Sequence, residues 1–143
     1  MRSMLAALTL VVTTGAAPLL AQEPAEAMAQ DEMQVTTAVV ATDIEDREPI
    51  GVSETFPADI GELYFFTVFE GDFPETEVEH VWLYEDEEMA RVPLTVTGPR
   101  WRTWSSKRLV TSWTGAWTVQ VVDSDGTVLE SVDFTVEAMP TGR

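Results

Sequence analysis

The sequence has no cysteine and one histidine among its 143 residues. The absence of cysteine excludes disulfides, thiolate zinc sites, iron–sulfur ligation and cysteine nucleophiles. A single histidine leaves no pair of imidazoles for a usual zinc site. A domain of this size must then be held together by its hydrophobic core. The sequence therefore predicts no metal and no cofactor.

Positive charge is also scarce. Eight Lys and Arg residues stand against 25 Asp and Glu residues, which gives a formal net charge of −17. Such a chain is soluble and repelled by nucleic acid and anionic lipid surfaces, so we expect no nucleic-acid partner. An acidic protein can attract cations, but a solvated acidic surface is the usual reason for this composition.

The first 21 residues have the layout of a secretory signal peptide. Arg2 supplies one positive charge, residues 4–12 are almost wholly apolar, and a small residue, Ala21, precedes Gln22. We therefore expect residues 1–21 to be removed and the protein to be periplasmic or extracellular. The alternative is a retained membrane anchor, which Pro18 disfavours, and membrane contact is expected only in that case.

The remaining chain divides into three parts. Residues 22–33 are rich in Ala, Glu and Gln and are predicted to be a flexible linker. Residues 34–137 are predicted to form one β domain, and residues 138–143 a tail. No amphipathic helical stretch of useful length and no internal repeat is found in the predicted domain.

Alternating apolar and polar residues predict about seven strands. Their approximate ranges are 34–42, 62–69, 78–84, 89–97, 101–110, 116–122 and 127–136. Residues 43–60 are interpreted as a long connection with room for a short edge strand. Pro93 lacks a backbone donor, so the fourth strand is expected at a sheet edge. The pattern favours an all-β fold, an immunoglobulin-like antiparallel sandwich of two sheets, with an eight-stranded barrel as the alternative.

Four residues are predicted for the core: Trp82, Trp117, Val119 and Phe134. Burying a large aromatic side chain stabilises a fold by roughly 2–3 kcal/mol. A buried tryptophan on the third strand is a recurrent feature of immunoglobulin-like sandwiches.

Four of the five tryptophans and four of the eight basic residues lie between residues 100 and 117. Exposed Trp beside Arg is typical of interaction hot spots. Alternation places Arg102 and Arg108 with Trp104 on one face and Trp101 with Lys107 on the other, so we expect one of these two tryptophans in the core. The candidate binding residues are Arg100, Trp101, Arg102, Trp104, Lys107 and Arg108.

Three motifs resemble an uncharacterised bacterial family, domain of unknown function 2914. They are residues 80–82 (HVW), residues 100–107 (RWRTWSSK), and residues 115–119 (GAWTV) followed by the hairpin at 122–126 (VDSDG). The resemblance covers His80 to Val136. It implies a small all-β domain that is exported or attached to a membrane, and it implies no activity and no catalytic residues.

His80 could serve as a general base or a metal ligand. However, Ser105 and Ser106 lie in a plain strand and not on the sharp turn that exposes a nucleophilic serine. We expect His80 to have a structural role, hydrogen-bonded at a sheet surface or a turn. The sequence predicts no catalytic residues and no enzyme.

Two acidic loops could hold a cation. Residues 123–126 begin like a calcium loop but lack its later oxygen ligands, so a tight turn is expected. Residues 85–88 are interpreted as a solvated acidic turn.

The sequence thus predicts a non-catalytic exported interaction module that binds a protein partner, or an accessory subunit of a periplasmic or membrane-associated complex. One alternative is a module that binds cell-envelope glycans through exposed tryptophan rings. A small hydrolase built around His80 is the least favoured alternative.

Overall fold

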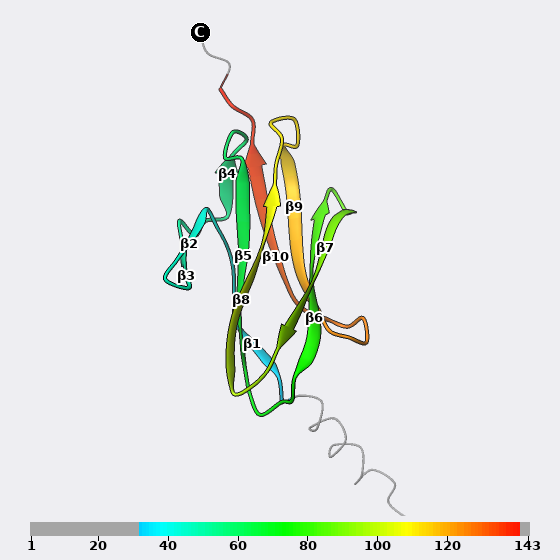
Figure 1. The fold of residues 1–143 in the computed structure, drawn as a ribbon. Helices are drawn as coiled ribbons and strands as arrows, with labels where there is room; N and C mark the ends of the chain where they lie inside the picture. The colour runs from blue at the N-terminus through cyan, green and yellow to red at the C-terminus, as the bar shows by residue number, and fades with distance from the viewer. Residues whose placement is uncertain (1–31, 141–143) are drawn as a thin grey trace, which may run out of the picture.

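Residues 32–140 are described by a computed structural model, and in them ten strands and no helix are found (Figure 1). This confirms the predicted all-β class. The predicted signal peptide at residues 1–21 and most of the predicted linker lie outside the described residues. Within the described part, the chain has no helix long and apolar enough to cross a membrane.

The first sheet has three antiparallel strands in the order β1-β5-β8. They are β1 (Gln34–Ala41), β5 (Glu62–Glu70) and β8 (Arg100–Arg108). β5 lies in the middle, as its continuous apolar run predicts, because a central strand is covered on both faces.

The second sheet has five strands in the order β4-β10-β9-β6-β7. They are β4 (Thr55–Pro57), β10 (Val128–Glu137), β9 (Gly115–Val122), β6 (Thr76–Tyr84) and β7 (Glu87–Val96). All neighbours are antiparallel except β4 and β10, which are parallel. β7 is an edge strand, which agrees with Pro93.

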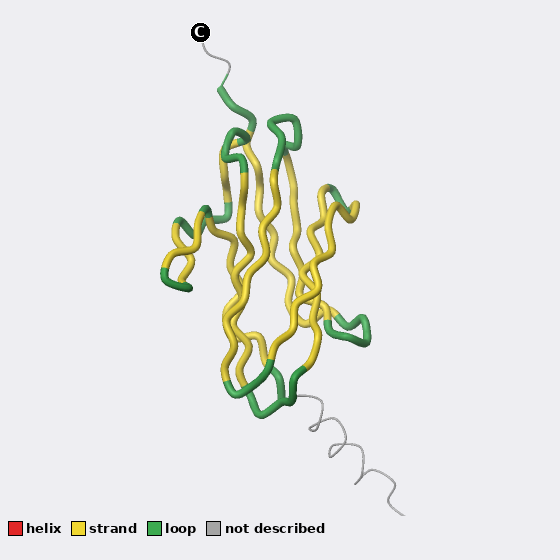
Figure 2. Tube along the Cα trace, viewed as in Figure 1, coloured by secondary structure: helices red, strands yellow, loops and turns green. Residues whose placement is uncertain are grey.

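The two sheets pack face to face as the predicted sandwich, with most loops at its two ends (Figure 2). All seven predicted strands are present, but the number of strands is ten, not about seven. The additional three lie in the connection at residues 43–60: β4 and the hairpin of β2 (Asp43–Glu45) and β3 (Glu48–Ile50). Three-residue strands are too short to show alternation.

The core lies between the sheets. The four residues predicted for it are all buried, with Trp82 and Val119 fully excluded from solvent. The rings of Trp117 and Phe134 stack with centroids 5.9 Å apart, and Trp82 meets Phe134 edge-on. The first contact joins the adjacent strands β9 and β10, and the second joins β6 to β10 across the intervening β9.

Candidate functional site

β8 carries all six candidate binding residues and forms one edge of the three-stranded sheet. Leu109, just beyond its end, donates its N–H to the carbonyl of Gly61 at 2.9 Å on the β5 side. Odd-numbered positions of β8 therefore turn their backbone groups toward β5, and even-numbered positions turn them toward the open edge. The arrangement places half of the strand's backbone polar groups at an unpaired edge.

The first half of β8 borders a shallow depression of about 350 Å³, which we call the arginine depression. It is lined by Arg47, Arg100, Trp101 and Arg102. Trp101 is 37% exposed, unusual for so large an apolar side chain. A second depression of about 320 Å³ adjoins it and shares Arg47, Trp101 and Arg102. It is also lined by Thr103 and Trp104 of β8 and by Leu94 and Thr95 of β7.

The arginines of this depression already have acidic neighbours. Arg100 Nη1 lies 3.4 Å from a carboxylate oxygen of Glu70, and Arg102 Nη1 lies 2.9 Å from one of Glu48. Arg102 also donates to the carbonyl of Arg47 in the turn between β2 and β3. Arg102 therefore attaches the β2–β3 hairpin to the sheet. Ion pairs this exposed contribute about 0–1 kcal/mol each, so they can be exchanged for other partners.

Neither tryptophan of the central motif is in the core, contrary to the expectation that one would be. Trp101 belongs to the inner face but lies near the start of the strand, where the sandwich no longer covers it. Trp104 belongs to the outer face, where its ring stacks on Phe66 with centroids 6.2 Å apart. Phe66 and Val68 are buried on that outer face. The Trp104 ring shields Phe66 from solvent, so its role is structural.

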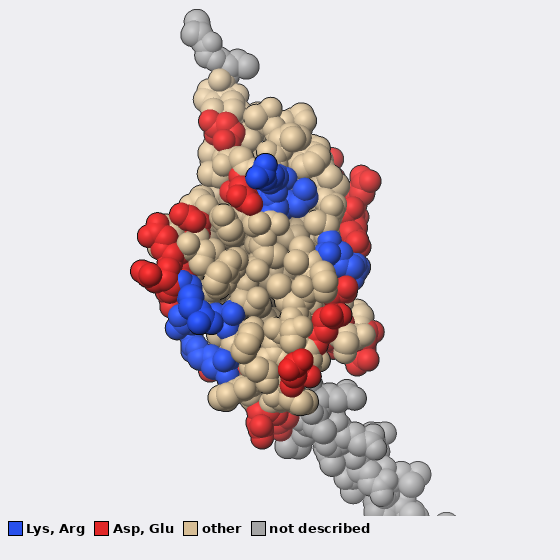
Figure 3. Space-filling view, in the orientation of Figure 1, with Lys and Arg blue, Asp and Glu red and all other residues tan. Residues whose placement is uncertain are grey.

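Lys107 and Arg108, at the other end of β8, do not join the arginine depression. The Lys107 ammonium lies 5.0 Å from the centre of the Trp113 ring, a cation–π contact. Arg108 is exposed and lies opposite Glu62 in the ladder. Figure 3 shows the Lys and Arg side chains in separate groups divided by uncharged surface. The four basic candidate residues therefore fall into two groups and not one.

Sequence reasoning missed Arg47, Leu94 and Thr95 as lining residues. Arg47 lies in the β2–β3 turn at a φ of 64°, and no local pattern indicates that this turn folds back against β8. Leu94 and Thr95 were assigned to the correct strand, but their closeness to β8 depends on how the two sheets meet.

His80 is fully buried, so the expectation that it lies at a sheet surface or turn is wrong. Its Nδ1 lies 2.7 Å from Ser105 Oγ, and its Nε2 lies 3.1 Å from Thr67 Oγ1. β6 supplies the histidine, and the opposite sheet supplies the two hydroxyls. The core accepts an imidazole here because both ring nitrogens have partners.

The donor and acceptor in each of these two bonds follow from the other hydrogen bond that each hydroxyl makes. The Thr67 hydroxyl donates to the carbonyl of Thr103, so it accepts from Nε2–H of His80. Trp82 Nε1 donates to Ser105 Oγ at 3.2 Å, and that hydroxyl donates to Nδ1 of His80. Each hydroxyl thus accepts one bond and donates one, and the imidazole is neutral with its proton on Nε2.

Burial lowers the pKa of His80 from its ordinary 6.5 to about 3. A neutral imidazole beside a serine is the arrangement of a nucleophile and its base. Here, however, His80 has no exposed surface and Ser105 is only 6% exposed. The contact is therefore almost wholly enclosed by the core, and it joins the two sheets.

The acidic turn at residues 123–126 is held by hydrogen bonds from its backbone to Asp123. Asp123 Oδ1 accepts the backbone N–H groups of Asp125 and Thr127, each at 2.9 Å, and Gly126 has a φ of 87°. The result is the expected tight turn.

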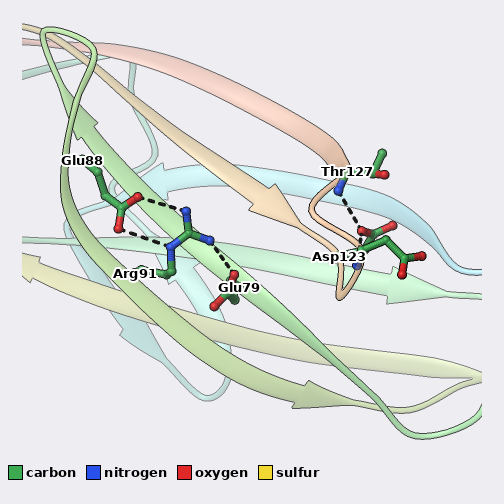
Figure 4. A network of polar contacts seen from close by, with 6 residues as sticks. Glu79, Glu88, Arg91, Asp123 and Thr127 are labelled. Carbon is green, nitrogen blue, oxygen red and sulfur yellow. Dashed lines mark hydrogen bonds and ion pairs between the residues drawn. The ribbon is translucent and has the colours of Figure 1, made fainter.

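Figure 4 shows this turn and, on β6 and β7, Arg91 between Glu79 and Glu88. The hydrogen bond from Arg91 lowers the pKa of Glu88. In residues 32–140 no group of three or more potential metal ligands occurs.

Similar solved structures include three beta-glucosidases. They come from Kluyveromyces marxianus (10% identity, TM-score 0.43), Listeria innocua, solved with laminaribiose (8%, 0.44), and Bifidobacterium adolescentis (10%, 0.42). The matches cover 74%, 75% and 77% of this chain but only 14%, 16% and 18% of those chains. At these scores the likeness carries no argument about activity.

The search of curated proteins returned no match. A family model, in contrast, does match the chain. Residues 75–136 match the model of the family described as "Protein of unknown function (DUF2914)", and the resemblance predicted from the three motifs is thereby confirmed.

Proposed function

We propose that this domain is a non-catalytic exported interaction module that binds an acidic segment of a protein partner, as an accessory subunit of a periplasmic or membrane-associated complex. The supporting observation is the arginine depression, where three arginines surround the exposed ring of Trp101. The rest of the chain is strongly acidic.

The chemistry of this depression suits carboxylates. Guanidinium groups bind carboxylates in a planar, paired geometry, and an adjacent indole adds apolar contact area. The present partners of Arg100 and Arg102 are the half-exposed carboxylates of Glu70 and Glu48. An acidic ligand can replace these carboxylates at little cost because exposed ion pairs are weak. Elsewhere the net charge repels the same ligand, which favours this one docking position.

The test compares retention of a partner from the native membrane fraction by three forms of the protein. One is the unaltered chain, the second carries Arg100→Glu with Trp101→Ala, and the third carries Arg108→Glu. Arg108 is on the same strand outside the arginine depression, so it controls for the loss of a positive charge. Arg102 and Trp104 are avoided because they hold the β2–β3 hairpin and Phe66.

We expect the double variant to lose the partner and Arg108→Glu to retain it. Both variants should stay folded and lose no more than about 1–2 kcal/mol of stability, since the changed side chains are exposed. Retention by the double variant at unchanged affinity would reject the proposed site.

A second candidate function is binding of a cell-envelope glycan. Trp101 lines both depressions, so its ring can serve as a platform on which a sugar ring stacks. Envelope glycan fragments should then change the tryptophan fluorescence, and the change should vanish in Trp101→Ala but persist in Arg100→Gln if the sugar is neutral. A flat titration would remove this candidate.

A further inference from the structure

A groove of about 520 Å³ lies on the opposite side of the sandwich from β8. It is lined by residues 38–40 of β1, 52–54 of the connection and 131–133 of β10. β1 is an edge strand of the first sheet, and β10 has β4 beside it only from Thr135 to Glu137. The groove therefore lies where the edges of both sheets are incompletely paired.

The backbone of β10 is open along this groove. Thr135 N donates to the carbonyl of Glu54, and Glu137 O accepts from Ala58 N, each at 2.9 Å. Odd-numbered positions of β10 thus turn their backbone groups away from β9. Ser131 and Asp133 share this direction, and on that side no strand among residues 32–140 pairs with them. The Ser131 N–H is met by an exposed carboxylate of Glu130 at 3.2 Å, which an added strand can displace.

The backbone of β1 is open toward the same groove. Val40 O accepts from Ser53 N at 3.2 Å, and Thr42 N donates to Ile50 O at 3.0 Å, so even-numbered positions point away from β5. Ala38 shares this direction and lines the groove. Two unpaired strand edges therefore border one groove, a geometry suited to a further extended chain.

The side chains of the groove set the chemistry of its occupant. Val39, Val132 and the 51%-exposed Val52 provide apolar contacts. Glu54 and Asp133 provide negative charge. A second copy of this chain docked through the same groove would bring its own Glu54 and Asp133, and like charges facing each other across strands are unfavourable.

We propose that this groove is a strand-addition site for an extended segment of a partner protein in which small apolar residues alternate with lysine or arginine. Backbone hydrogen bonds to Ser131 and Asp133 supply binding, apolar side chains contact the valines, and the basic residues face Glu54 and Asp133. The site is independent of the arginine depression, whose proposed ligand is acidic.

The probe is a blocked peptide of alternating lysine and valine, added to isotope-labelled protein and followed by NMR amide shifts. We expect saturable shifts at Ala38, Ser131, Asp133 and their neighbours. The same peptide with glutamate in place of lysine, or with N-methylated valines, should not bind, because the first reverses the charge and the second removes the backbone donors.

Two variants test the two contributions. Ser131→Pro removes an edge donor that pairs with no strand, which an edge position tolerates, and Glu54→Lys reverses an exposed charge at the groove. Each should weaken peptide binding by about tenfold or more. Glu77→Lys, an equal charge change at an exposed position of β6, is the control and should bind as the unaltered chain does. If Ser131→Pro unfolds, Glu54→Lys still decides the question.

The proposal is overturned by absence of shifts, by shifts confined to other surfaces, or by variants that bind the peptide as tightly as the unaltered chain does. It is also overturned if the protein forms dimers that Ser131→Pro dissociates, since the occupant would then be a second copy. Loss of peptide binding leaves the arginine depression untouched, so the two proposals fail separately.

Discussion

Ser105 Oγ lies 2.7 Å from Nδ1 of His80, and this hydrogen bond crosses the interior from the smaller sheet to the larger one. With Trp82 and Thr67 it forms a continuous chain of bonds in which every polar side-chain atom has a partner. Polar networks inside a core stabilise only when complete, so each member is expected to be sensitive to substitution.

The network makes stability depend on pH. The pKa of His80 is about 3 in the fold and near 6.5 in the unfolded chain. The unfolded chain therefore binds a proton first as the pH falls. Below pH 6.5 the free energy of unfolding should decrease by about 1.4 kcal/mol per pH unit, down to about pH 3, and above 6.5 this contribution is constant.

Urea unfolding of the unaltered chain and His80→Gln between about pH 7 and about pH 4 measures this effect. The two proteins carry the same acidic residues, so the difference between them isolates the imidazole. We expect the stability advantage of the unaltered chain to shrink steadily with acid. A difference that stays constant over this range would contradict the assignment of His80 as buried and neutral.

Ser105→Ala should lower the free energy of unfolding by about 2–4 kcal/mol, because Trp82 Nε1 loses its acceptor and His80 Nδ1 its donor. Ser106→Ala is a matched control one residue along the chain. Ser106 is exposed, so its change should stay within about 0.5 kcal/mol. Equal effects of the two substitutions would argue against the network.

The two tryptophans of β8 should behave differently. Trp104→Ala uncovers Phe66 and should cost about 1–3 kcal/mol of stability. Trp101→Ala should cost less than about 1 kcal/mol because part of the ring is already in water. Thermal unfolding of both variants checks this order, and the reverse order would mean that Trp101 is the structural ring.

Asp123→Ala should destabilise the β9–β10 hairpin, since two backbone N–H groups lose their acceptor. We expect a loss of about 1–2 kcal/mol, and a smaller loss for Asp123→Asn, which keeps a carbonyl oxygen at the same place. Added calcium should change the stability of none of the three proteins. A calcium-dependent rise in the midpoint of unfolding would show that the loop binds the ion.

Much of the fold could be predicted because its long strands carry a periodic signal. Pro93 indicated an edge, and residues 123–126 indicated the last turn. The β2–β3 hairpin could not be predicted, because its strands are short and one of its attachments is Arg102 to Glu48, residues 54 positions apart. Alternation correctly separated Trp101 from Trp104, but it could not show that Phe66 lies beneath one of them and that the sandwich ends beside the other.

The candidate site was only partly accessible to sequence reasoning for the same reason. The basic residues of β8 were identified, yet their separation into two groups depends on Trp113 approaching Lys107 and on Arg47 reaching back to β8. The position of His80 depends on the register between the two sheets, which places Ser105 opposite it. Neither relationship leaves a local pattern in the chain.

The parallel pairing of β4 with β10 has a mechanical consequence. The described chain enters the sandwich near one end and leaves it at the other (Figure 1). Tension between these points would pull β4 and β10 in opposite directions along their length, so the bonds from Thr135 to Glu54 and from Ala58 to Glu137 would be loaded together and not opened one after another. A domain built this way can carry load between two attached structures without first unravelling at an end.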